Sequence, residues 1–163
     1  MYTNNKVGNV IYKVIEYFGD DVRRINHFLK VYGYVKMIGE CENLDDSMQE
    51  ILEVTAVLHD VGIKVAEQKY NSSAGHYQQL EGPPVAKKIL DELGYPDDFV
   101  ERVMYLIAHH HTYTNIDGMD YQILVEADFL VNADEDRLSS DAIENFKEKI
   151  FKTTTGIAVL ENN

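Results

Sequence analysis

The sequence predicts a single all-α domain, and three observations support this fold class. Apolar residues recur at helical spacing in about six or seven segments, and no segment alternates as a strand would. The chain has 163 residues, enough for one well-formed core but too few for two comfortable domains. We therefore expect residues 1–163 to form one domain. Its core should cover about residues 20–137, with an N-terminal and a C-terminal helix packed against it.

The first two helices follow from apolar stripes. Residues 7–18 place valine, isoleucine and phenylalanine at helical spacing along one face. Asp20 or Asp21 can cap a second helix that runs to about Gly39. His27 falls on an apolar stripe of this second helix, so we expect its side chain to face inward or to lie at the edge of the core.

The third helix should be the central one. Residues 48–60 form it, and the stretch 51–58 is apolar almost all round, which indicates burial on every side. This helix ends in His59 and Asp60. Burying an unpaired carboxylate is costly, so the pair indicates half of a metal site. The alternative is an ordinary helix end, with the histidine near the negative end of the dipole and Gly62 as the stop signal.

Residues 64–81 form a long polar segment, which we expect to be a connection suited to ligand contact or simply a mobile surface loop. Pro83 and Pro84 then mark the start of a fourth helix, and Gly94 follows its end. Proline is favoured in the first turn of a helix and glycine just past its end, so we place this helix at residues 85–93.

A fifth helix follows, with Asp97 or Asp98 as its cap. Its apolar stripe continues in phase to the histidine run at residues 109–111. His110 is the best placed of the three, although the sequence does not determine which of them faces a site.

The sixth and seventh helices complete the domain. An irregular stretch at residues 112–119 leads to Asp120, the expected cap of the sixth helix. Asp128 lies on the apolar side of that helix and therefore needs a cation or hydrogen-bond donors. The last helix covers about residues 140–151, and a short tail follows it.

Composition narrows the classes of partner. The formal net charge is −13, which disfavours nucleic-acid polymers and anionic membrane surfaces. The single Cys41 excludes an internal disulfide and fits a reducing compartment. There is no secretory signal pattern, and no apolar run approaches the roughly 18 residues that would cross a bilayer. We expect a cytoplasmic protein, and the sequence gives no indication of its oligomeric state.

The inward-facing polar residues form a coherent set of metal ligands. His27, His59, Asp60 and Asp128 lie on three separate helices and supply two imidazoles and two carboxylates. Such a set suits a divalent transition ion such as Mn, Fe, Co, Ni or Zn, and it leaves positions for water and substrate.

The order and spacing of these residues resemble the HD-domain superfamily of metal-dependent phosphohydrolases. His27 precedes His59 by 32 residues, and Asp60 precedes Asp128 by 68. The resemblance extends from about residue 25 to residue 134, through four motifs. They are Val57-Leu58-His59-Asp60-Val61-Gly62, Glu81-Gly82-Pro83-Pro84-Val85-Ala86, Ile107-Ala108-His109-His110-His111 and Leu124-Val125-Glu126-Ala127-Asp128. It implies an HD-domain helical bundle around one metal held by His27, His59, Asp60 and Asp128.

Two departures from the family pattern bear on activity. Nucleotidases and guanosine-polyphosphate hydrolases of this family carry an acidic residue shortly after the His-Asp pair, whereas this chain has Lys64. Members with two metals use further histidines. Glu81 and His110 occupy positions similar to those histidines, and a carboxylate can replace an imidazole on Mn or Fe. A second ion is therefore compatible with the sequence.

The expected function is hydrolysis of a phosphate ester or anhydride, in a small nucleotide or related phosphorylated metabolite, by a metal-activated water. Asp60 would also orient the water. Lys64 would pair with phosphate or is an exposed lysine, and Glu81 would be a ligand, an acid or base, or a charge at a helix N-terminus. Two other classes stay open: a dinuclear-iron oxygenase of the HD type and a non-catalytic nucleotide-binding sensor.

Overall fold

Helices account for all regular structure in the computed structural model, which describes residues 6–162. The expected all-α fold class is confirmed. No helix within the described range has both the length and the apolar content needed to span a bilayer. The nine helices of the described residues are α1 (Lys6–Phe18), α2 (Val22–Cys41), α3 (Asp46–Leu58), α4 (Ile63–Tyr70), α5 (Gly75–Glu92), α6 (Asp97–His109), α7 (Met119–Glu135), α8 (Ser140–Ile150) and α9 (Thr154–Glu161).

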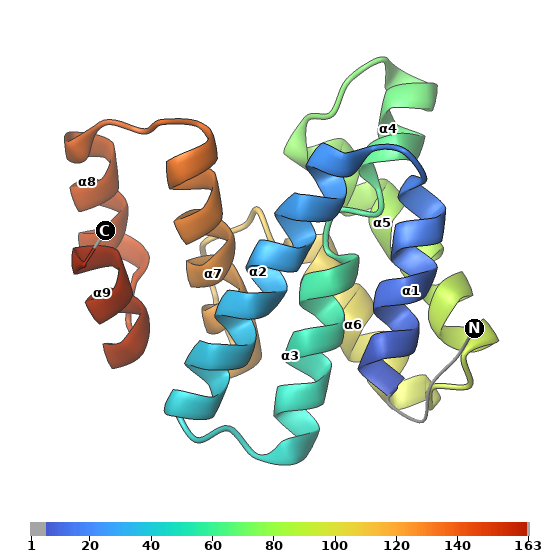
Figure 1. Cartoon of the computed structure of the whole chain (residues 1–163), viewed down its shortest axis with the longest axis horizontal. Helices are drawn as coiled ribbons and strands as arrows, with labels where there is room; N and C mark the ends of the chain where they lie inside the picture. The colour runs from blue at the N-terminus through green and yellow to red at the C-terminus, as the bar shows by residue number, and fades with distance from the viewer. Residues whose placement is uncertain (1–5, 163) are drawn as a thin grey trace.

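Helix α3 lies at the centre of the bundle, in contact with α1, α2, α6 and α7 (Figure 1). Every residue from Leu52 to Leu58 is buried, including Glu53 and Thr55. The expectation of a central helix surrounded on all sides is therefore confirmed. Thr55 satisfies its hydroxyl within the helix by donating to the carbonyl of Ile51 (2.7 Å), so its burial leaves no unpaired donor.

Two apolar clusters flank α3. One joins α3 to α1, α5 and α6 and includes Val14 and Ile107. The other joins α3 to α2, α6, α7 and the C-terminal helices and includes Val35 and Leu124. Because both clusters share α3, the end of α3 is held from both sides. The side chains that follow it therefore have a rigid support.

The C-terminal helices α8 and α9 cover the outer side of α7 (Figure 1). Phe146 of α8 stacks on Phe129 of α7 with ring centroids 3.8 Å apart. Sequence patterning predicted a short tail after residue 151, but this tail contains α9. Thr153 caps α9 by accepting a hydrogen bond from the backbone N–H of Gly156, and its own hydroxyl donates to the buried Glu126 (2.6 Å).

The region between α3 and α6 corrects two expectations. The polar segment at residues 64–81 contains α4 and the first turns of α5, and the helix expected at 85–93 begins ten residues earlier, at Gly75. Pro83 and Pro84 lie inside α5, although proline there removes backbone hydrogen bonds. Gly62 packs so closely on the backbone of Gly82 that a Cβ on Gly62 would fall 2.6 Å from the Gly82 nitrogen. This tertiary contact, which local patterning does not include, lies directly before the prolines.

The structure confirms only some of the helix caps that the sequence predicted. Asp21 caps α2 by accepting from the backbone N–H of Arg24, one of the two aspartates expected there. Pro96 and Gly118 hold the cap positions of α6 and α7, so Asp97, Asp98 and Asp120 are not caps but lie in the first turns. An aspartate in a first turn still interacts favourably with the helix dipole.

Candidate metal centre

Four side chains from three parts of the chain meet at one point. His27 comes from α2, His59 and Asp60 follow α3, and Asp128 comes from α7. The Nε2 atom of His27 lies 3.1 Å from Asp60 Oδ2 and 3.2 Å from Asp128 Oδ1. The Nε2 atom of His59 lies 3.3 Å from each of the same two oxygens. The structure therefore brings together the four residues proposed as metal ligands.

The imidazole of His59 is fixed by the end of its own helix. His59 is the C-cap of α3, is fully buried, and its Nδ1 lies 2.6 Å from the carbonyl oxygen of Ala56. A carbonyl only accepts hydrogen bonds, so Nδ1 carries the proton and donates it. In the neutral ring, Nε2 then presents a lone pair to the centre.

A carboxylate fixes His27 in the same way. Its Nδ1 lies 2.8 Å from Oε1 of Glu135, which follows Asp128 by two turns of α7. The ring therefore donates from Nδ1 to Glu135, and its Nε2 faces the Nε2 of His59 at 3.3 Å. Carboxylate partners of this kind set the tautomer and orientation of metal-binding histidines. The sequence-based interpretation missed Glu135, although its spacing from Asp128 places both residues on one face.

The donor atoms fit a divalent transition ion. Ligands about 2.0–2.2 Å from a metal are separated from one another by roughly 2.8–3.6 Å at angles between 90° and 109°. The two imidazole Nε2 atoms lie 3.1–3.3 Å from each other and from the nearest oxygens of Asp60 and Asp128, which is within that range. Asp128 Oδ1 is buried close to both imidazoles, yet it makes no hydrogen bond of acceptable geometry within the described structure. A buried carboxylate oxygen that lacks a hydrogen-bond donor is suited to bind a metal ion in place of the donor.

The charges of the centre also favour a cation. Burial lowers the pKa of His27, but contacts with Asp128 and Asp60 outweigh burial and raise the pKa to about 10. Burial opposes protonation of His59 as well, yet the charge of Asp60 raises its pKa well above the usual value. Burial raises the pKa of Asp60, but the neighbouring His59 outweighs it and holds the pKa well below the usual range. The ionised carboxylates thus require positive charge between them.

A second group of donor atoms shares Asp60. His110 is the C-cap of α6, and its Nδ1 lies 2.6 Å from the carbonyl of Ile107, which leaves Nε2 aimed away from the helix. That Nε2 is buried without a hydrogen-bond partner in the described residues and lies 3.7 Å from Asp60 Oδ1. Together with His111, these atoms form a second set within metal-binding reach of one another.

The three consecutive histidines have three different environments. His110 faces the centre, whereas His109 turns back to the carbonyl of Tyr105 and stacks on its ring. His111 lines the cavity over the centre, with its Nε2 3.2 Å from Oε1 of Gln78. Burial and the neighbouring His110 lower the pKa of His111 to about 4, so His111 is neutral at physiological pH. Its Nε2 therefore donates to Gln78.

The structure does not bring Lys64 or Glu81 to the centre. Lys64 lies in the first turn of α4, where its ammonium contacts the carbonyl and the ring of Tyr17 on α1. The carboxylate of Glu81 accepts from Tyr70 (2.9 Å) and from Lys69 (3.2 Å), and these contacts lower its pKa. Among the described residues, neither side chain lines the cavity at the centre, and Glu81 joins neither group of donor atoms.

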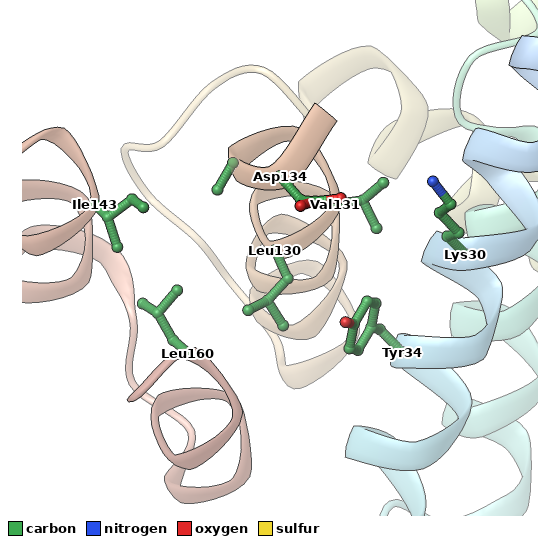
Figure 2. A pocket seen from close by; sticks show the side chains of 8 residues that line it. Lys30, Tyr34, Leu130, Val131, Asp134, Ile143 and Leu160 are labelled. Carbon is green, nitrogen blue, oxygen red and sulfur yellow. The ribbon is translucent and has the colours of Figure 1, made fainter. Parts of the chain in front are cut away.

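A cavity of about 320 Å³ opens directly over the centre and is lined by His27, Asp60 and Asp128. A larger cavity of about 620 Å³ lies between α2, α7 and the C-terminal helices, where Tyr34, Leu130 and Leu160 give it an apolar lining (Figure 2). Within the described part of the chain, no cluster of metal-binding side chains lines this larger cavity, so the smaller cavity is the site suited to chemistry.

Comparisons with known proteins agree with this description. A family model described as HD domain matches residues 24–144. A crystal structure described as a predicted HD superfamily hydrolase, from an uncultured Thermotogales bacterium, is similar with a TM-score of 0.64 and 23% sequence identity. That similarity covers 96% of this chain and 82% of the other and concerns the fold. No curated protein matches the sequence.

Proposed function

Because the chain belongs to the HD-domain family, we propose that it is a metal-dependent phosphohydrolase that acts on a small phosphorylated metabolite such as a nucleotide. The observation that carries the proposal is the convergence of two imidazole Nε2 atoms and two ionised carboxylates below an open cavity. His27, His59, Asp60 and Asp128 would hold the ion. When bound, a divalent ion supplies an acidified water and polarises a phosphoryl oxygen.

The protein's own groups would orient the reactants. Asp60 points one oxygen, Oδ2, at the imidazoles of His27 and His59, and its other oxygen, Oδ1, toward His110. Since the pKa of Asp60 is held well below the usual range, its carboxylate is ionised at neutral pH. Asp60 Oδ1 can therefore accept a hydrogen bond from the attacking water and orient it. His110 Nε2, which has no hydrogen-bond partner among the described residues, faces Asp60 Oδ1 and can accept a second hydrogen bond from this water.

Size and charge support a small substrate. A cavity of about 320 Å³ is at the lower end of the range for small-molecule sites. The formal net charge of −13 opposes the approach of a polyanionic polymer. A monomeric nucleotide or a phosphorylated metabolite is therefore favoured over nucleic acid.

The test is a hydrolysis screen of phosphomonoesters, dinucleoside polyphosphates and nucleoside triphosphates with a panel of divalent ions. Asp60→Ala and Asp128→Ala should lose both bound metal and hydrolysis. Asp134→Ala is the matched control, because it removes an exposed carboxylate from the same helix as Asp128, outside the centre, and should leave both properties unchanged. Hydrolysis that survives in Asp60→Ala or Asp128→Ala would show that the chemistry lies elsewhere.

The second group of donor atoms favours one alternative, a dinuclear-iron oxygenase. Asp60 Oδ1, His110 and His111 would then hold a second ion. Metal analysis of protein purified without added ions separates the two functions. Two irons per chain with oxygen uptake would support the oxygenase, whereas one exchangeable Mn, Co, Ni or Zn with phosphate release would support the hydrolase. Nucleotide binding without turnover across all the metals would instead indicate a sensor.

A further inference from the structure

Two permanent positive charges, Arg23 and Arg24, line the cavity over the centre among the described residues. Both precede His27 on α2. Two lysines of the neighbouring helix α4 are engaged by other residues. Lys64 contacts Tyr17, and Lys69 contacts Glu81. An anionic substrate that enters the cavity therefore meets these two guanidinium groups.

The two arginines are not equivalent. Arg24 is bound on both sides, to Asp21 at 3.0 Å and to Glu67 at 2.7 Å, so its charge is already neutralised. Arg23 is exposed, and its guanidinium makes no ion pair or hydrogen bond with another side chain of the described range. It lies four residues before His27 and therefore on the same face of α2. Arg23 is thus the cation of the cavity that is available to a ligand.

The C-terminal end of α7 contributes the opposite charge to the same cavity. Glu135 and Asp136 both line it, and Glu135 is engaged by His27. Asp136 is exposed and makes no ion pair with a described residue. A single phosphate group can be matched by the ion and one guanidinium. Among the residues that line the cavity, further phosphates would find no second free cation and would approach the carboxylate of Asp136.

We propose that Arg23 binds the phosphate of a phosphomonoester substrate and that Asp136 disfavours substrates with further phosphates. This assignment rests on the proposed function and narrows its substrate class. Guanidinium is suited to the role because it donates two parallel hydrogen bonds to a phosphate, whereas an ammonium acts as a point charge. Arg23→Lys should accordingly retain only part of the phosphate affinity.

Binding of inorganic phosphate to the metal-loaded protein tests Arg23 directly, without turnover. Arg23→Gln should weaken phosphate binding about tenfold or more, the value of a charged hydrogen bond, and leave the metal content unchanged. Arg23→Lys should recover part of the loss. Lys30→Gln is the matched control, because Lys30 is an exposed cation on the same helix but lines the larger, apolar cavity instead. It should bind phosphate as the wild type does.

Asp136 is tested with pyrophosphate in the same titration. Asp136→Asn should raise the affinity for pyrophosphate several-fold relative to inorganic phosphate, because one repulsive charge is removed. With a hydrolysed phosphomonoester, Arg23→Gln should raise KM more than it lowers kcat, since Arg23 binds the phosphate in the ground state as well as in the transition state.

The possible failures are distinguishable. Unchanged phosphate affinity in Arg23→Gln, loss of metal in that variant, or no phosphate binding by the wild type would each overturn the assignment of Arg23. An unchanged preference in Asp136→Asn would overturn the role of Asp136. Absence of hydrolysis across the substrate screen would instead refute the proposed function, while the phosphate titration would still decide whether Arg23 is an anion-binding residue.

Discussion

Metal binding at this centre should release protons, and the amount can be worked out from the structure. Burial lowers the pKa of His27, but Asp128 and Asp60 outweigh it and raise the pKa to about 10. At pH 7 the ion-free imidazole therefore carries a proton on the atom that an ion would occupy. Because pH 7 is three units below this pKa, removing the proton costs about 4 kcal/mol, which weakens metal binding roughly a thousandfold. His59, whose pKa is also raised, should release a second proton.

Isothermal titration calorimetry measures this effect. Binding of one divalent ion is followed between pH 6.5 and 8.5 in buffers of different ionisation enthalpy, which gives the number of protons released. We expect one to two protons per ion, and an affinity that rises about tenfold per pH unit for each proton. Asp134→Ala, which lies outside the centre, should show the same number. An affinity independent of pH, or binding without proton release, would refute the assignment of His27 and His59 as ligands.

Three further predictions concern stability and metal affinity. In metal-free protein, the raised pKa of His27 stabilises the fold, fully below about pH 6.5 and less as the pH rises toward 10. The Tm measured with a chelator should therefore fall across that pH range, whereas the Tm measured with metal should not. Gly156→Ala should cost about 1–3 kcal/mol in urea unfolding, because the new Cβ would collide with the Glu126 carboxylate. Gly33→Ala, in open space on α2, should instead gain about 0.5–1 kcal/mol, and equal effects would contradict this reasoning. Glu135→Ala should weaken metal binding about 10- to 100-fold, as measured by calorimetry, and Glu135→Gln should recover part of the lost affinity. Unchanged affinity in both variants would show that Glu135 does not position His27.

The helices were predictable where an apolar stripe or an apolar run was long. The central helix is the strongest example, because residues 51–58 are apolar nearly all round and are also the most enclosed. The two helices that the sequence did not reveal, α4 and α9, have eight residues each. A helix of two turns shows too few repeats for a periodic signal, and its stability comes from contacts with the rest of the fold.

The start of α5 was misplaced for a different reason. Proline was interpreted by its local preference for a first turn, which places a helix start at Pro83. The helix continues through both prolines, next to the close contact between Gly62 and Gly82. Local preference cannot include a contact between segments twenty residues apart, so the boundary had to come from the structure.

Within the site, the sequence predicted which side chains face inward but not which residues they contact. The spacing that places Asp128 on an inward face depends only on helical geometry, and the structure agrees with it. Glu81 is also buried, but Lys69 and Tyr70 bind its carboxylate, and no spacing rule predicts that pairing. Of the two alternatives for Lys64, a phosphate partner or an exposed lysine, the structure agrees with the exposed lysine. The first turn of α4 directs Lys64 toward Tyr17.

The geometry of the centre has a common cause in two helix ends. His59 and His110 are the C-caps of α3 and α6, and each donates from Nδ1 to the carbonyl three residues before it. Carbonyls of a last turn have no partner within the helix, so this one contact satisfies the helix and also turns Nε2 toward Asp60. Helix C-termini carry partial negative charge, and here two of them lie beside ionised carboxylates. The centre therefore attracts cations before any ion is bound. An anionic substrate, in contrast, depends on the ion and on a free guanidinium such as Arg23 for its affinity.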